Sequence, residues 1–177
     1  MKTAPNKAPL MVLLFCLVVL PLAAQTGKFY STNNELSSSL INQIFQDKRG
    51  FIWIATEYGL NRFDGLRFSN YKHMSGDSTS IKNNYVRTLY EDSRQNLLVG
   101  CIDGLMKYDS ETDTFREIPM IRAGKQVFPH VTQMQKLHNG EIWAVTTGQG
   151  IFRLDEEKQQ AVSIDAIMKQ VNYKFQS

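Results

Sequence analysis

A pattern of residues recurs along the chain at intervals of 45 positions, and this recurrence restricts the fold more than any other feature of the sequence. A shift of 45 residues carries Ile44-Phe45-Gln46-Asp47 to Leu89-Tyr90-Glu91-Asp92, and two such shifts carry Trp53 to Trp143. With one inserted residue in the third copy, the recurrent positions also include Gly59, Gly104 and Gly150, Arg62, Lys107 and Arg153, and Asp64, Asp109 and Asp155. Self-similarity at a fixed period indicates stacked structural units, so the sequence contains three copies of one unit.

Each copy is predicted to form a set of short strands. In the first copy, the segments 41–47, 51–56, 59–64 and 67–71 are rich in Ile, Phe, Tyr and Trp, and turn residues separate them. Short strands of this composition, bounded by turn signals, indicate an all-β chain. Only the segment 161–171 suggests a short helix.

Four short strands in a unit of this length match one blade of a β-propeller, whose repeats span ~40–45 residues. Leucine-rich repeats are shorter, and helical repeats need a different periodicity. We therefore predict an all-β, partial β-propeller of about three four-stranded blades. The expected boundaries are a lead-in at 25–35, blades at 36–80, 81–125 and 126–165, and a tail or the start of a fourth blade at 166–177.

The first residues have the layout of a secretory signal peptide. Lys2 and Lys7 provide a positive start, residues 10–22 are almost continuously apolar, and Ala23-Ala24-Gln25 supplies small residues for cleavage. This layout predicts a signal peptide at 1–24 that exports the chain to the periplasm. The apolar run is shorter than the ~20 residues of a membrane-spanning helix, which disfavours a permanent anchor.

The charge of the remaining chain is almost balanced. Without residues 1–24 the chain has 18 basic and 17 acidic residues, with no basic stripe that would suggest nucleic acid or an anionic membrane surface. Cys101 is then the only cysteine, so no internal disulfide is possible. Its apolar neighbours Val99 and Ile102 predict that it is a small buried hydrophobic residue.

Positions that recur in the copies are expected to serve the fold. Trp53 and Trp143 share one strand position, which favours packing between blades over ligand contact. The recurrent glycines are expected to turn the chain at positive φ, and Asp47 and Asp92 precede hairpin turns, where a carboxylate accepts backbone N–H groups. The basic residues at 62, 107 and 153 and the acids at 64, 109 and 155 are expected to act in structural pairs or turns.

The segments DKRGFIWIATEYGLNRFDG, DSRQNLLVGCIDGLMKYD and NGEIWAVTTGQGIFRLD resemble successive repeats of the two-component regulator propeller family. The run LSSSLINQIFQD resembles the lead-in to the first such blade, and the resemblance covers residues 36–155. It implies the N-terminal periplasmic sensor blades of a hybrid two-component sensor histidine kinase. Such sensors respond to glycan breakdown products and control transcription of the genes for their use.

The sequence departs from the family pattern in composition and in length. Leu98 replaces the usual tryptophan, Gly100-Cys101 replaces Gly-Thr, and Ala55 and Ala144-Val145 lie where glycine is usual. Family members carry more blades, followed by a membrane span and kinase modules, and propellers close with ~4–8 blades. We therefore expect a truncated gene or a fragment, and as an alternative a chain that completes its propeller by assembling with copies of itself.

The sequence predicts no catalytic, metal or cofactor site. Gly148-Gln149-Gly150 begins like a dinucleotide fingerprint, but it lies between strands and lacks the third glycine. His73, His130 and His138 are scattered without metal-ligand spacing, and no nucleophile motif is present. We therefore expect no enzyme activity, no cofactor and no metal.

A ligand is expected to contact loop residues that differ between the copies. The aromatic or polar choices in such loops are Tyr58, Tyr71, His73, Phe128 and His130. The favoured function is a sensory module for an oligosaccharide, which passes a rearrangement to a kinase. The alternative is an orphan propeller fragment for protein–protein assembly, with further blades or copies of itself as partners. A polysaccharide lyase or hydrolase is the remote alternative, and membrane contact is expected only through the export signal or a missing C-terminal part.

Overall fold

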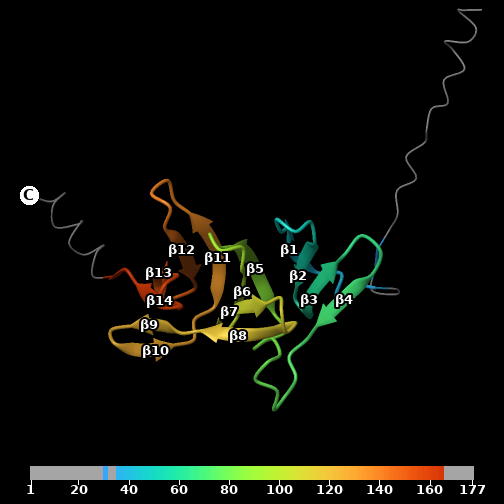
Figure 1. The fold of residues 1–177 in the computed structure, drawn as a ribbon. Coiled ribbons are helices and arrows are strands. Elements are labelled where there is room, and N and C mark those ends of the chain that lie inside the picture. Colours follow the sequence, from blue (N-terminus) through green and yellow to red (C-terminus); the bar gives the residue numbers. More distant parts are fainter. Residues whose placement is uncertain (1–29, 32–34, 166–177) are drawn as a thin grey trace, which may run out of the picture.

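Three β-sheets, two of them wholly antiparallel, lie side by side in the structure, a computed structural model that describes residues 30–31 and 35–165 (Figure 1). Blade 1 contains β1 (Ile41–Gln46), β2 (Ile52–Thr56), β3 (Gly59–Phe63) and β4 (Phe68–Tyr71). Blade 2 contains β5 (Val86–Glu91), β6 (Leu97–Cys101), β7 (Gly104–Asp109) and β8 (Thr114–Ile118). Blade 3 contains β11 (Val131–Lys136), β12 (Ile142–Thr146), β13 (Gly150–Asp155) and β14 (Gln160–Ser163). This arrangement confirms the predicted all-β chain built from propeller blades.

The first strand of each blade contacts the first strand of its neighbour, so β5 lies between β1 and β11 (Figure 1). The pairing of the first and second strands has the same irregularity in every blade, because the register shifts directly after Ile41, Val86 and Val131. Such a bulge bends a strand and increases its local twist. The three copies therefore share a backbone geometry as well as a sequence pattern.

The sheet of blade 3 contains two additional strands. The connection between blades 2 and 3 forms a hairpin of β9 (Met120–Arg122) and β10 (Lys125–Val127), and β9 pairs in parallel with β14. The strands of blade 2 end at Ile118, and residues 120–127 join the third sheet. The expected helix at 161–171 is wrong in its first residues, since β14 forms there, and the residues after 165 lie outside the described chain.

The connections into blades 2 and 3 contact the outer strands of those blades, β8 and β14. In blade 2 the backbone N–H of Phe115 donates to the carbonyl of Thr79 at 2.8 Å. In blade 3 the N–H of Ala161 donates to the carbonyl of Pro119 at 2.8 Å. Exposed edge strands invite pairing with other chains, so these bonds protect the sheets from open-ended association.

One repeat position explains the shape of the first hairpin in each blade. The carboxylate of Asp47 accepts the N–H groups of Arg49 and Phe51, and its second oxygen accepts the indole N–H of Trp53 at 2.9 Å. Asp92 accepts two backbone N–H groups in the same way, but the side chain of Asn96 replaces the indole, because blade 2 has no tryptophan there. The aspartate thus fixes the turn, as the sequence predicts.

In blade 3 the corresponding aspartate is replaced by Leu137. The indole N–H of Trp143 instead donates to Glu141 Oε2 at 3.1 Å. Glu141 stands at the same repeat position as Asn96, so one position supplies the substitute partner in both blades.

The turns between second and third strands need glycine. Gly59, Gly104 and Gly150 have φ values of +134°, +135° and +79°, which side chains rarely tolerate. A Cβ atom on Gly59 would lie 2.8 Å from the carbonyl oxygen of Tyr71, so space as well as conformation excludes other residues.

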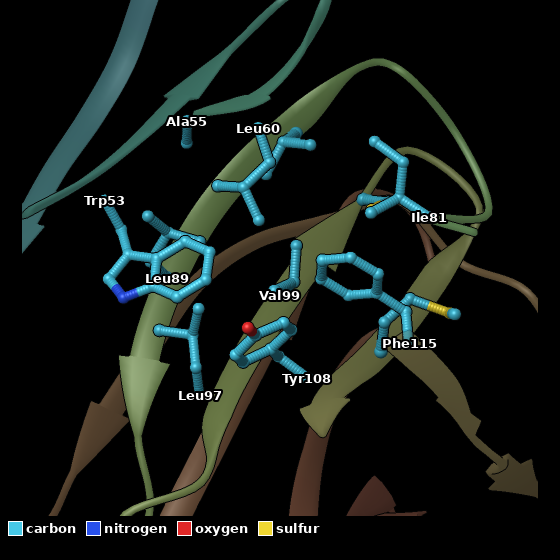
Figure 2. Close-up of a cluster of buried hydrophobic side chains, with 12 residues drawn as sticks. Trp53, Ala55, Leu60, Ile81, Leu89, Leu97, Val99, Tyr108 and Phe115 are labelled. Carbon is cyan, nitrogen blue, oxygen red and sulfur yellow. The ribbon is translucent and has the colours of Figure 1, made fainter. Parts of the chain in front are cut away.

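The interface between blades 1 and 2, called interface 1/2, is rich in aromatic residues (Figure 2). Trp53 of blade 1 is fully buried, and its ring makes an edge contact with Tyr108 of blade 2, with 4.9 Å between centroids. Tyr71 of blade 1 packs against Tyr108 and Phe115. The predicted role of Trp53 in packing between blades agrees with this position.

The interface between blades 2 and 3, called interface 2/3, is mainly aliphatic. Its buried residues are Leu98, Leu105, Ile118, Met120, Val131, Met134, Ala144, Phe152 and Ala161. Gly100 lies here because a Cβ atom would come within 2.6 Å of Thr88 Cγ2 and 2.9 Å of Val131 Cγ1. Cys101, nearby in β6, is buried and unpaired as predicted, and burial raises the pKa of its thiol to about 12.

A polar contact crosses each interface from the recurrent basic residue of β3 or β7. Arg62 Nη1 donates to Tyr108 Oη at 2.5 Å and lies 3.3 Å from Asp113 Oδ1. Lys107 Nζ donates to Gln159 Oε1 at 2.5 Å. Asp113 and Gln159 each follow a recurrent aspartate by four residues, and both have positive φ, +57° and +51°. These two contacts are therefore one repeated device, which we call the interblade latch.

The recurrent acids stabilise the turns between the third and fourth strands, two of which carry Asp113 and Gln159 of the latch. Asp64 accepts the backbone N–H groups of Leu66 and Arg67, Asp109 accepts that of Glu111, and Asp155 accepts that of Lys158. These bonds, with the ion pair from Arg116 in the case of Asp109, lower the pKa values of all three carboxyl groups. A turn role for these acids is what the repeat predicts.

Candidate functional site

One side of the three blades gathers the loops that vary between copies. It carries the turns after the second strands (57–58, 102–103 and 147–149) and the connections between blades (72–85 and 119–130). Backbone bonds tie each turn to the residue before the innermost strand: Glu57 to Leu40, Ile102 to Tyr85, and Thr147 to His130. We call this side the linker face.

The three anchoring residues of the linker face occupy one repeat position but differ completely in chemistry. They are Leu40, Tyr85 and His130, each 45 residues after the last. Tyr85 Oη donates to Glu57 Oε1 of blade 1 at 3.2 Å, and its ring lies edge-on to the His130 imidazole, 5.9 Å between centroids. Side chains from all three blades therefore converge at the inner ends of the linkers.

Two polar atoms on this face are buried without a hydrogen-bond partner in the described chain. They are His130 Nε2 and Asp103 Oδ1, although the second oxygen of Asp103 accepts a bond from Asn83. Burial and the nearby charge of Arg87 lower the pKa of His130, which favours the neutral form of its ring. Because buried polar atoms rarely lack partners, these atoms are positions where a polar ligand would be stabilised.

On the linker face, each of two exposed aromatic rings lies against the side-chain ammonium of a lysine. Tyr58 is 58% exposed with Lys72 Nζ 4.8 Å from its ring centroid, and Phe128 is 52% exposed with Lys82 Nζ at 3.8 Å. An exposed flat ring offers apolar area at low entropic cost, and the ammonium adds hydrogen-bond donors beside it. This combination suits a ligand with an apolar face and a polar rim, such as a sugar ring.

His73 lies beside a hollow of about 250 Å³ formed by the connection between blades 1 and 2. Its Nδ1 is 3.0 Å from the carbonyl of Ile81, and its backbone N–H donates to Asn84 Oδ1 at 2.7 Å. His73 therefore helps to fix the shape of the connection, and Lys82 and Glu117 border the same hollow.

The structure separates Tyr71 from the other predicted ligand residues. Its ring packs within interface 1/2, and its hydroxyl donates to Asp113 Oδ1 at 2.7 Å. Burial and this bond raise its pKa. The structure thus brings Tyr58, His73, Phe128 and His130 to the linker face and leaves Tyr71 between blades, and a ligand role for any of them stays a prediction.

The sequence prediction missed Tyr85, Lys72 and Lys82. Tyr85 could have been found, because it stands midway between Leu40 and His130 at the repeat interval. The lysines could not, since their contacts with Tyr58 and Phe128 depend on how the connections fold back.

Among residues 30–31 and 35–165 no group of three His, Cys, Asp or Glu side chains could hold a metal ion. Within the same residues no helix is long and apolar enough to cross a membrane.

The chain is similar to extracellular domains of two component systems. Residues 35–58 match the sequence model of the family described as two component regulator propeller. The chain is 30% identical to the extracellular domain described as that of the hybrid two component system BT3049 from B. thetaiotaomicron, with a TM-score of 0.66. That alignment covers 76% of this chain and 19% of the other. The resemblance to two-component regulator propeller repeats is therefore confirmed.

Two further relatives agree with this result. The extracellular domain of system BT4673 from the same organism is 25% identical with a TM-score of 0.59, over 68% of this chain and 17% of that one. A protein named histidine kinase P4 from Formosa agariphila is 40% identical over 74 residues, which is 40% of this chain and 5% of that protein. The chain thus spans a small part of each relative.

A virginiamycin B lyase from Staphylococcus aureus is similar in fold alone. The identity is 17% and the TM-score 0.53, over 73% of this chain and 42% of the lyase. This likeness shows that the propeller architecture is shared and carries nothing about activity.

Proposed function

We propose that the chain is a non-catalytic, exported sensor segment that binds an oligosaccharide at the linker face. In this proposal the chain forms part of a hybrid two-component sensor that responds to glycan breakdown products and controls transcription. The observation that carries the proposal is the convergence of variable side chains from three blades, Tyr85, His130 and Glu57, beside the lysine-capped rings of Tyr58 and Phe128. The similarity to extracellular domains of two component systems supports it.

The proposed mechanism uses contacts with more than one blade. A ligand held by residues of blades 1, 2 and 3 binds more tightly to one relative arrangement of the blades than to others. Only such a difference in affinity can shift a conformational equilibrium. The shift passes to a kinase outside the described residues, and export relies on the signal peptide expected at 1–24, which also lies outside them.

The test is calorimetric titration of the purified chain with neutral hexasaccharides of glucose, xylose and mannose. One of them should bind, and Tyr58→Ala and Phe128→Ala should each weaken its binding at least about fivefold, as truncation of an aromatic contact does. Leu66→Ala is the matched control, because Leu66 is an exposed apolar residue in the β3–β4 turn on the opposite side. Equal binding by all three variants would overturn the site, and turnover of a glycan would overturn the non-catalytic part.

A second candidate function is assembly with further blades or with copies of the chain. It is favoured by Ile41 and Ile44 of β1, which are 45% and 62% exposed. Their repeat equivalents Val86 and Leu89 are 0% and 1% exposed, because blade 1 covers them. Analytical ultracentrifugation tests this candidate: self-association that Ile44→Ser reduces supports it, and a monomer at all concentrations contradicts it.

A further inference from the structure

A basic hollow lies between blades 2 and 3, along β7, β8 and the turn after β5. Its volume is about 430 Å³, and it is lined by Arg94, Lys107 and Arg116 of blade 2 and Gln159 of blade 3. We propose that this hollow binds an anionic group, a carboxylate or a sulfate, either as a free anion or on an acidic oligosaccharide. The proposal does not depend on the linker face and stands or falls without it.

The charges around the hollow are not balanced. Its lining contains three cations and one acid, Glu117, whose carboxylate already accepts bonds from Lys82 at 2.8 Å and from Gln126 at 2.6 Å. Arg116 is paired with Asp109. Arg94 and Lys107 form no ion pair with any residue in the described part of the chain.

The interblade latch supplies an internal comparison. Of the three recurrent basic residues, Arg62 is paired with Asp113 and Arg153 with Glu141. Lys107 faces the neutral amide of Gln159 at the position where interface 1/2 has a carboxylate. Interface 2/3 therefore keeps the cation of the latch but lacks its anion, and a ligand can supply that charge.

The donors in the hollow suit an anion. Lys107 Nζ uses one of its three donors on Gln159 and is half-buried, so its remaining donors are incompletely hydrated. The one hydrogen bond that the Arg94 side chain makes within the described chain is from Nη1 to the carbonyl of Glu156, at 3.4 Å. An ammonium and a guanidinium together make charge-assisted hydrogen bonds to a carboxylate or sulfate, and the volume is within the range of small-ligand sites.

An anion in this hollow would hold two blades together. Lys107 belongs to β7 of blade 2, and Gln159 precedes β14 of blade 3. A ligand that binds only the assembled interface stabilises it by RT ln(1 + c/Kd), where c is the free ligand concentration, so the stabilisation grows with the logarithm of that concentration. Bound anion should therefore raise the thermal unfolding temperature of the chain.

The experiment titrates the purified chain with trigalacturonate, sodium sulfate and neutral maltotriose, using calorimetry at low salt. An anion should bind, with an affinity that falls as salt rises, while maltotriose does not bind. Tighter binding of trigalacturonate than of sulfate identifies an acidic saccharide as the source of the group, and equal binding identifies a free anion. The proposal is overturned if neither trigalacturonate nor sulfate binds, or if maltotriose binds as tightly as the anions.

The decisive variant is Gln159→Asp. It gives Lys107 the carboxylate partner that Arg62 already has, so it keeps the latch and the fold but should weaken anion binding about tenfold or more. Arg94→Gln, at an exposed position, should also weaken binding, and from interface 2/3 it removes only the 3.4 Å contact with the carbonyl of Glu156. Lys125→Gln on β10 is the control with an equal loss of charge outside the hollow. Binding that is the same in Gln159→Asp, Arg94→Gln and the unaltered chain would contradict the assignment.

Discussion

Interfaces 1/2 and 2/3 use the same repeat positions but different chemistry. The position of Trp53 in blade 1 is Leu98 in blade 2, and that of Ala55 is Gly100. The latch is a charged pair, Arg62 with Asp113, in one interface and a cation with an amide in the other. The repeat therefore determines where blades touch, whereas the side chains determine how strongly they adhere and what else can enter.

The two interfaces therefore differ in packing: interface 1/2 is filled by side chains, whereas interface 2/3 contains a hollow. Interface 1/2 fills its space with aromatic rings in edge contact, and its charges neutralise one another within the protein. Interface 2/3 leaves a hollow in which two of the three cations, Arg94 and Lys107, form no ion pair within the described chain. If the hollow binds an anion as proposed, stability and ligand binding fall on neighbouring copies of one repeat.

The largest expected effect comes from removing the aromatic centre of interface 1/2. Trp53→Ala should lower the free energy of unfolding by about 4 kcal/mol, because it leaves a large cavity and an unpaired oxygen on Asp47. Leu98→Ala, the same repeat position in interface 2/3, should cost about 3 kcal/mol. Urea denaturation of both variants tests the comparison, and a smaller loss for Trp53→Ala would reverse the ranking of the interfaces.

A methyl group added at Gly100 should destabilise interface 2/3, because the space beside Gly100 is occupied. Gly100→Ala should lower the free energy of unfolding by about 2 kcal/mol, since its Cβ would meet Thr88 and Val131 at less than normal contact distance. The reverse change in blade 1, Ala55→Gly, should cost only about 1 kcal/mol. Thermal unfolding compares the two, and a neutral Gly100→Ala would show that interface 2/3 is loosely packed.

The charged latch should make interface 1/2 sensitive to acid. Burial raises the pKa of Asp113, but bonds from Tyr108 and Tyr71 and the charge of Arg62 outweigh burial, so its pKa lies below the ordinary 3.8. Its contribution is therefore complete above that ordinary value and is lost as pH falls through the folded-state pKa. Because the side chain is 56% exposed, the effect at pH 7 should be at most about 1 kcal/mol.

The variant Asp113→Asn measures this contribution. Asparagine tolerates the positive φ of the position, so the backbone should not change. Urea titrations between pH 7 and pH 2 should show a smaller loss of stability in the variant than in the unaltered chain. Parallel curves would mean that the pair contributes nothing.

The smallest effect is expected on the uncovered side of blade 1. Ile44→Ala should change the free energy of unfolding by less than about 0.5 kcal/mol, because Ile44 is 62% exposed. Its repeat equivalent Leu89 is buried in interface 1/2, and Leu89→Ala should cost about 3 kcal/mol. Denaturation of the two variants tests this contrast, and a large loss for Ile44→Ala would reveal a contact made by self-association.

Much of the blade architecture follows from local rules that can be applied to the sequence. The glycines at 59, 104 and 150 turn at positive φ, and Asp47 and Asp92 accept backbone N–H groups, as their spacing predicts. The strands of the first copy begin and end within one residue of the predicted limits. These features depend on residues close together in the chain, where steric and hydrogen-bonding rules act directly.

By itself, therefore, the sequence determined the repeat, the blades and the turns. Only the tertiary structure decided which equivalent residues differ in role. Leu89 is buried whereas its equivalent Ile44 is exposed. Tyr71 lies in interface 1/2, and residues 120–127 belong to the third sheet. The tertiary structure also brought Lys107 to Gln159 and Tyr85 to His130 across blades. The reason is physical: a repeat specifies each blade locally, but exposure, pairing and charge balance depend on the neighbour that packs against it.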